Sequence, residues 1–148
     1  MLKTLIRDIS AISITALIGL AQVQTPEMNK ILTAAAQSLA EMTFDSAAPV
    51  TVHGRVAILV WPEGTSGMIV VEAEGSGDKY AFSTAKVPVM ARQGFSRFTM
   101  QPGADVVVTG VQAKGDAKIG PGFKAARADI VTKSDGNRVF DRSRLEKQ

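Results

Sequence analysis

The sequence predicts a mainly β fold: a five-stranded OB-like Greek-key barrel with a short helix between strands 3 and 4 and an N-terminal amphipathic helix. Two valine-rich segments, 50–56 and 105–113, each carry a glycine in their interior. Glycine inside a strand marks a bulge or a sharp bend, which a small closed barrel needs at its corners. The predicted elements also follow the OB-fold order of three strands, a short helix and two strands.

Composition favours a single globular domain. The chain has 148 residues, 45% of them hydrophobic and 21% charged, which is an ordinary balance for a folded protein. It contains no cysteine, and this excludes disulfides, thiolate metal sites and a cysteine nucleophile. The net charge is only +3 and basic and acidic residues interleave, so no clustered basic face for nucleic acid is predicted.

Residues 1–21 have the pattern of a signal peptide. A basic start precedes the charge-free apolar run 9–20, and small residues up to Ala21 suit a signal peptidase. The run is shorter than the roughly 20 residues that span a bilayer. A buried first helix is the alternative, and Asp8 favours it. We expect a mature chain that begins at Gln22, has no transmembrane segment and is periplasmic or secreted.

The segment 22–43 is predicted to hold an amphipathic helix over residues 25–42. Thr25 can cap this helix, and Pro26 suits its first position. Its apolar residues follow helical spacing on one stripe: Met28, Ile31, Leu32, Ala35, Leu39 and Met42. We expect the stripe to pack on the barrel or to plug one of its ends; the alternative is a docking face for a partner.

The barrel domain is predicted over residues 44–140, followed by a charged, frayed tail at 141–148. Turn residues predict a linker at 44–49, a short helix over 88–93 that Gly94 ends, and an exposed mobile loop at 114–124. Strands are predicted at 50–61, 68–74, 79–83, 105–113 and 125–132, with a short edge strand at 138–140. The expected core comprises Val52, Val56, Ile58, Ile69, Val71, Phe82, Met90, Phe95, Val106, Val108, Val111 and Ile130.

Several short motifs occur together in a characteristic order. They are Phe44-Asp45, Pro49-Val50-Thr51-Val52-His53-Gly54-Arg55-Val56, Gly94-Phe95-Ser96-Arg97, Met100-Gln101-Pro102-Gly103-Ala104-Asp105-Val106-Val107-Val108-Thr109-Gly110, Ala125-Ala126-Arg127 and Asp135-Gly136-Asn137-Arg138-Val139-Phe140. Over residues 44–140 this pattern resembles a family of small exported bacterial domains of unknown function. The resemblance implies a signal peptide and an OB-like barrel.

The histidine motifs of that family are missing from this chain. Its members carry His-His-Ser near the mature N-terminus and Asn-Pro-His in the first hairpin. The predicted helix takes the first place here, and Trp61-Pro62-Glu63-Gly64 takes the second. No metal or ligand role of those histidines therefore transfers to this chain, and the resemblance names no substrate.

The sequence shows no recognisable catalytic cluster. The one histidine, His53, has no second imidazole and no carboxylate at ligand spacing, so we expect it at the surface or at the barrel mouth. Glu72 and Glu74 share one face of a strand. They could form an acid/base pair, but two solvated glutamates are the simpler interpretation. We therefore expect a non-enzymatic protein without cofactor or metal.

Three residues are candidates for ligand contact: Trp61, Tyr80 and Arg97. Aromatic side chains beside basic residues can stack on a ligand, as OB-folds do with bases. The first hypothesis is an exported binding domain for a protein partner or a small ligand. The alternative is a single-stranded nucleic-acid-binding OB module, which would need these basic residues on one face: Lys79, Arg92, Arg97, Lys114, Lys118, Lys124 and Arg127.

Overall fold

The protein is mainly β, as predicted, with six strands and two helices in the part of the chain that the structure describes. The computed structural model describes residues 25–145 except 63, 98 and 120–121, so the predicted signal peptide lies outside it. The elements in chain order are α2 (Pro26–Ala40), β1 (Phe44–Val60), β2 (Ser66–Ala73), β3 (Lys79–Lys86), α3 (Val87–Arg92), β4 (Asp105–Ala113), the 3-10 turn η1 (Lys114–Asp116), β5 (Phe123–Lys133), β6 (Arg138–Asp141) and the 3-10 turn η2 (Arg142–Arg144).

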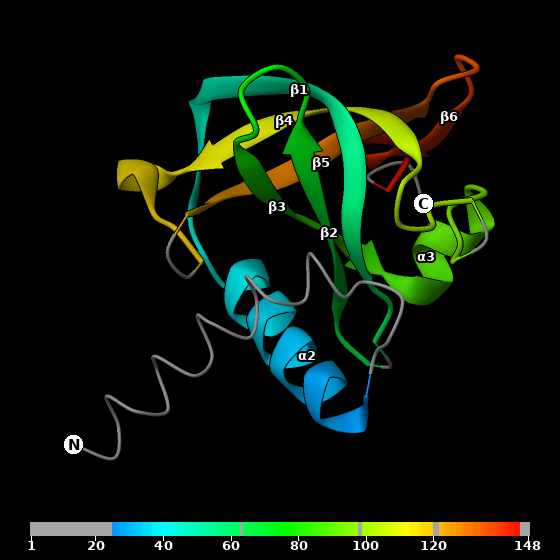
Figure 1. Cartoon of the computed structure of the whole chain (residues 1–148), viewed down its shortest axis with the longest axis horizontal. Helices are drawn as coiled ribbons and strands as arrows, with labels where there is room; N and C mark the ends of the chain where they lie inside the picture. The colour runs from blue at the N-terminus through cyan, green and yellow to red at the C-terminus, as the bar shows by residue number, and fades with distance from the viewer. Residues whose placement is uncertain (1–24, 63, 98, 120–121, 146–148) are drawn as a thin grey trace.

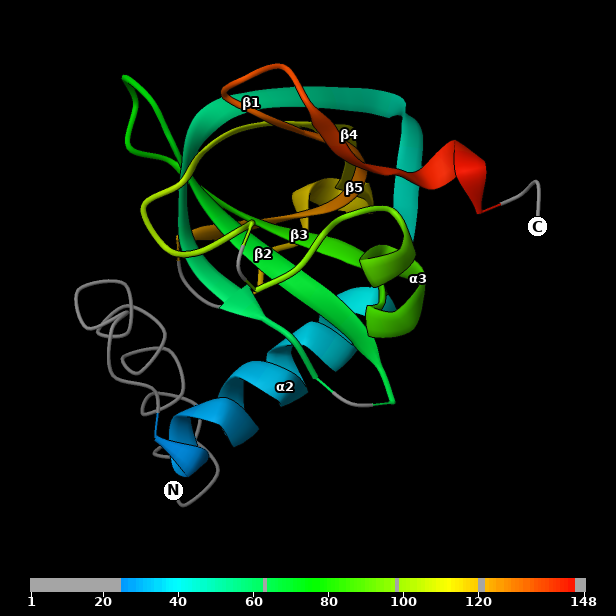
Figure 2. The same ribbon diagram turned by 90° about the vertical axis from the view of Figure 1, so that its right-hand side faces the viewer.

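The strands form one sheet that closes into a ring (Figures 1 and 2). The order β3-β2-β1-β4-β5-β6 is antiparallel throughout. A parallel pairing closes the ring, because Lys79–Ser83 of β3 lies beside Phe123–Arg127 of β5. Strand β6 adds to β5 outside the ring. No helix in the described part of the chain is both long enough and apolar enough to cross a membrane.

The two glycine-containing strands lie next to each other. Gly54 of β1 pairs with Val106 of β4, and Gly110 of β4 pairs with Val50 of β1. A methyl group at Gly54 would overlap the backbone carbonyl of Glu72 in β2. One at Gly110 would likewise overlap a carbonyl of β5. The glycines are therefore required because the backbone of the strand paired on their other side, β2 for Gly54 and β5 for Gly110, approaches too closely for a side chain.

The side chains of the sheet fill two separate layers, one inside the ring and one outside it. In β1, Val52 and Val56 face the inner layer, whereas Ile58 faces the outer one. The change follows from a bulge, since Val56 pairs with Val71 but Ile58 pairs with its neighbour Val70. An extra residue in a strand moves the following side chains to the opposite face.

All the predicted core residues are buried except Ile130. A bulge in β5 explains the exception. Thr109 pairs with Ile130, whereas Gly110 pairs with Ala128, so the alternation shifts and Val131 takes the buried position instead.

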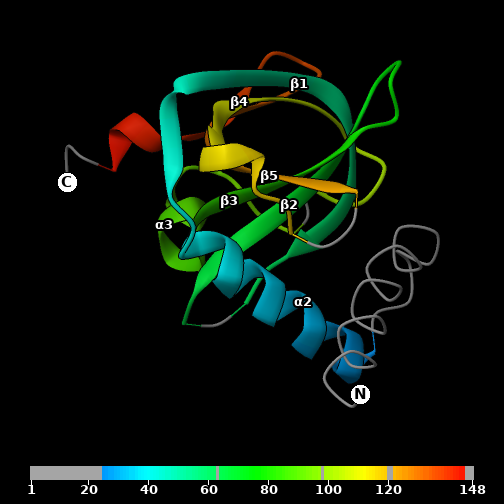
Figure 3. The same cartoon turned by 90° about the vertical axis from the view of Figure 1, so that its left-hand side faces the viewer.

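Helix α2 packs on the outer layer and does not plug an end of the ring (Figures 2 and 3). Thr25 caps it, as predicted, since its hydroxyl accepts from the amide of Met28 at 3.2 Å. Leu32, Ala36 and Leu39 are buried on its inner side. They share a cluster with residues of β2, β3 and β5: Met68, Val70, Ala81, Phe123 and Ala125.

Helix α3 lies at one end of the ring, between β3 and β4 as predicted (Figure 1). Met90 of α3 and Phe95 after it are buried in the inner layer. Trp61 stacks on Phe95, with ring centroids 5.7 Å apart and planes 4° apart. This end of the ring is therefore closed by apolar side chains.

Two segments predicted to be irregular instead contribute strand residues or buried side chains to the fold. The expected linker 44–49 is the first part of β1. The expected mobile loop 114–124 contains η1 and contributes buried side chains, with Ile119 8% and Phe123 2% exposed. Glycine and lysine content suggested a loop, but Ile119 and Phe123 instead pack in the layer under α2.

Residues 141–145, the described part of the tail expected to fray, are held by hydrogen bonds. Asp141 ends β6, and its backbone amide and carbonyl both bond the side chain of Gln93, at 2.8 and 3.2 Å. Arg142 donates to the carbonyl oxygens of Thr84 at 2.7 Å and Ala128 at 2.9 Å. A charged segment is expected to fray only when its charged groups are solvated. The guanidinium of Arg142 instead donates hydrogen bonds to backbone carbonyls.

Candidate functional site: a groove across the bend of β1

A groove of about 830 Å³ lies on the outside of the ring where β1 bends. We call it the crease groove. Strands β1, β2 and β4 and the turns that precede β3 and β4 contribute its walls, and neither helix lines it. Its lining includes His53, Gly54, Arg55, Glu72, Glu74, Gly75, Gly77, Gly103 and Asp105.

Glycine accounts for the hollow shape. Gly75, Gly77 and Gly103 adopt positive φ angles of 88°, 73° and 93° in the flanking turns, a conformation that glycine adopts without strain. A Cβ atom at any of these three glycines would meet nothing within 4 Å, so a ligand in the groove could approach the backbone of these turns closely.

The floor of the groove carries charges of both signs. Arg55 of β1 lies opposite Glu72 of β2 and opposite Asp105 of β4. Its Nε is 3.4 Å from an Asp105 carboxylate oxygen, with the two side chains 77% and 64% exposed. So exposed an ion pair contributes little to stability, and its partners remain accessible to a ligand.

His53 and Glu74 lie beside this pair. The backbone amide of Glu74 donates to the carbonyl of His53 at 2.8 Å, and both residues are exposed. His53 is thus at the surface, as expected, and Glu72 and Glu74 are solvated. Within the described part of the chain, no three histidine or carboxylate residues come together in a way that could hold a metal.

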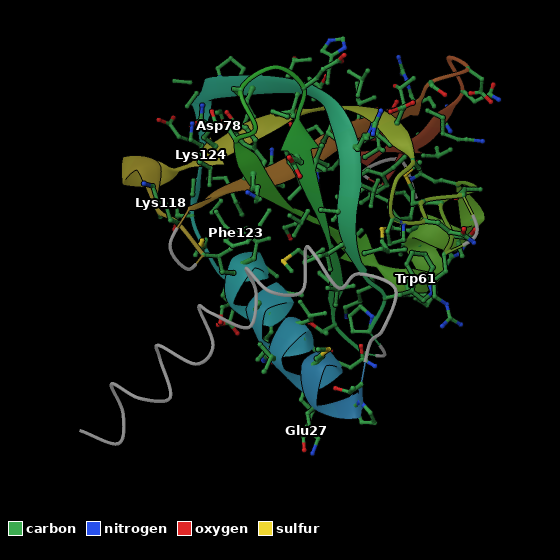
Figure 4. The ribbon with its side chains drawn as sticks, viewed as in Figure 1. Glu27, Trp61, Asp78, Lys118, Phe123 and Lys124 are labelled. Atoms are coloured by element: carbon green, nitrogen blue, oxygen red, sulfur yellow. The ribbon has the colours of Figure 1, made fainter. Side chains whose placement is uncertain are left out.

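The three predicted ligand-contact residues do not meet. Trp61 is half-buried against Phe95 at the α3 end, and Arg97 is exposed in the turn after α3. The ring of Tyr80 stacks on Phe82 at 5.9 Å and has the ammonium of Lys124 5.3 Å from its centroid. Figure 4 shows Trp61 on one side of the molecule and Lys124 on the other.

The basic residues of the nucleic-acid hypothesis also separate into two groups. Arg92 and Arg97 lie in and after α3, whereas the others belong to β3, η1, β5 or the segment just before β5. Lys118 and Lys124 lie far from α3 in Figure 4. Lys124 bonds Asp78 at 3.3 Å, and this bond raises the pKa of its ammonium.

The fold and the groove define a small β-sheet domain with a polar outer groove and an added N-terminal helix. Residues 28–121 match a family of unknown function, DUF6152, and the chain belongs to that family. The match runs from α2 through β4 and includes the whole crease groove. Comparisons with curated proteins and with solved structures gave no match.

Sequence reasoning considered His53, Glu72 and Glu74 but did not identify Arg55 or Asp105 as their neighbours. A signal was present, because polar residues, His53 and Arg55, occupy the exposed positions on both sides of Gly54 in β1. Which strands face that segment depends on register, and the local pattern does not contain this information.

Proposed function

We propose that the chain is an exported, non-enzymatic binding domain with an OB-like Greek-key barrel, and that it contacts a protein partner or a small ligand through the crease groove. The observation that carries this proposal is the position of the groove. It lies on a part of the ring that neither α2 nor α3 covers, and it offers both exposed charges and accessible backbone.

The strand order supports the OB-like assignment. Around the ring the strands follow β1-β2-β3-β5-β4, with β3 and β5 parallel. An α-helix lies between β3 and β4. A five-stranded Greek-key barrel with these features is typical of OB-folds.

Site-specific photo-crosslinking in the producing cell tests the proposed surface. A benzophenone amino acid replaces Glu74 at the groove, and in a matched control it replaces the exposed Lys30 on α2. We expect one discrete adduct from position 74 and none of that mass from position 30. The same adducts from both positions, or none from position 74, would contradict the proposal.

The nucleic-acid alternative ranks lower because of α2. OB-folds bind oligonucleotides on a face centred on strands 2 and 3, and α2 covers the outer face of β2 and β3 here. Measuring the binding of a labelled oligothymidylate at increasing salt concentrations decides between the proposed function and the nucleic-acid alternative. A true site would lose affinity steeply with salt, whereas we expect no saturable binding at any salt concentration.

The export part of the proposal rests on residues 1–21. Cell fractionation with a C-terminal tag and mass spectrometry of the mature N-terminus tests it. We expect the protein outside the cytoplasm with Gln22 as its first residue. Full-length protein that keeps Met1 in the cytosol would refute export and leave the proposed binding surface untouched.

A further inference from the structure

Two arginines outside the crease groove converge on a single carboxylate oxygen. Arg127 Nε lies 3.0 Å from Asp129 Oδ1, and Arg142 Nε lies 3.3 Å from the same atom. The side chains of Arg127, Arg142 and Asp129 are only 36%, 23% and 30% exposed, respectively. The cluster therefore holds one uncompensated positive charge in a partly desolvated place.

Both guanidinium groups are held in position. Arg142 donates from Nε to Ala128 O at 2.9 Å and from Nη2 to Thr84 O at 2.7 Å. It lies over the ring of Phe140, 5.5 Å from the centroid, and Arg127 lies 6.0 Å from that of Phe44. Burial, followed by the charge of Arg127, lowers the pKa of the Arg142 guanidinium.

The carboxylate of Asp141, next to Arg142 in the sequence, is already engaged. Asp141 Oδ2 accepts from Arg138 Nη1 at 3.1 Å, and Asp141 Oδ1 accepts from the hydroxyl of Ser143 at 2.6 Å. The Ser143 hydroxyl is the main reason why the pKa of Asp141 is below its ordinary value. Asp141 is therefore ionised at neutral pH, but both its oxygens are used elsewhere.

Donor capacity is left over in the cluster. In the described part of the chain, neither Arg142 Nη1 nor the Nη atoms of Arg127 donate to a protein group. We propose that Arg127 and Arg142 form a binding site for a small oxyanion, with Asp129 as the built-in counter-charge. Guanidinium groups present paired donors that match the oxygens of phosphate and carboxylate groups.

Thermal unfolding of the full chain, followed by the fluorescence of the single tryptophan, tests the site. Inorganic phosphate, acetate and chloride are compared at equal ionic strength. We expect phosphate to raise Tm saturably by about 3 °C or more over chloride. A matching rise with acetate assigns the site to carboxylates, a rise with phosphate alone assigns it to phosphate groups, and no rise with either overturns the proposal.

Three variants separate the site from a general salt effect. Arg127→Gln should abolish the rise in Tm, whereas Arg92→Gln, at an exposed arginine of α3 outside both the crease groove and the cluster, should keep it. Asp129→Asn removes the internal counter-charge, so it should lower Tm in chloride and show a phosphate-dependent rise larger than that of the wild type. An equal rise in Arg127→Gln and wild type, or no larger rise in Asp129→Asn, would show that the two arginines bind no anion.

Discussion

At the scale of single residues, Gly54 and Gly110 decide whether the ring can form. Each lies where another strand's backbone crosses so closely that a Cβ atom has no room. The conformational freedom of glycine is not the reason, because neither residue has a positive φ angle. The absence of a side chain is what these positions require.

Gly54→Ala is therefore expected to destabilise the protein by about 3 kcal/mol, through steric overlap with the carbonyl of Glu72. Gly64→Ala is the matched control. Gly64 has a φ of 77° and open space around it, so alanine there costs only about 1 kcal/mol of backbone strain. Urea unfolding followed by Trp61 fluorescence measures both values, and equal losses would contradict the close-approach explanation.

At the scale of elements, α2 is an integral part of the domain. Its apolar stripe covers side chains from β2, β3 and β5, and these would otherwise face solvent on the outside of the ring. Hydrophobic burial of this kind is the main source of stability for an amphipathic helix. The helix thus stabilises the sheet and occupies one of its faces.

Leu39→Ala is expected to lower the free energy of unfolding by about 3 kcal/mol, since Leu39 is fully buried on the inner side of α2. Lys30→Ala, on the exposed side of the same helix, should change it by less than about 0.5 kcal/mol. Urea midpoints of the two variants test the difference. If Leu39→Ala were as mild as Lys30→Ala, α2 would not be packed on the sheet.

At the scale of the whole molecule, closure of the ring depends on distant segments. Lys79–Ser83 pairs with Phe123–Arg127, and Arg142 bonds both β3 and β5 close to where this pairing ends. Neither half of the sheet can bury the inner layer without the other. The ring should therefore unfold as one unit.

Urea unfolding should give a single transition in which Trp61 fluorescence and far-UV circular dichroism coincide. Trp61 reports on the α3 end of the ring, whereas circular dichroism reports on all the strands. Transitions with different midpoints would show that α3 and its surroundings open separately from the sheet.

Local patterns predicted much of the secondary structure. Strand 105–113 was predicted to the residue, and α2 and α3 were found. The candidate site was predicted from the sequence only in part. Trp61, Tyr80 and Arg97 are chemically plausible ligand contacts, but the ring of Tyr80 already contacts Phe82 and Lys124. Lys124 lies on the opposite side of the molecule from Trp61 (Figure 4).

The sequence by itself determined the order of the elements and their periodicity, because these depend on neighbouring residues. Only the tertiary structure decided that α2 lies outside the ring, that bulges move Ile58 and Val131 to their faces, and that Arg142 is buried. The crease groove and the Arg127–Asp129–Arg142 cluster likewise join residues from different elements. Their chemistry depends on strand register, and register is set by packing across the whole molecule.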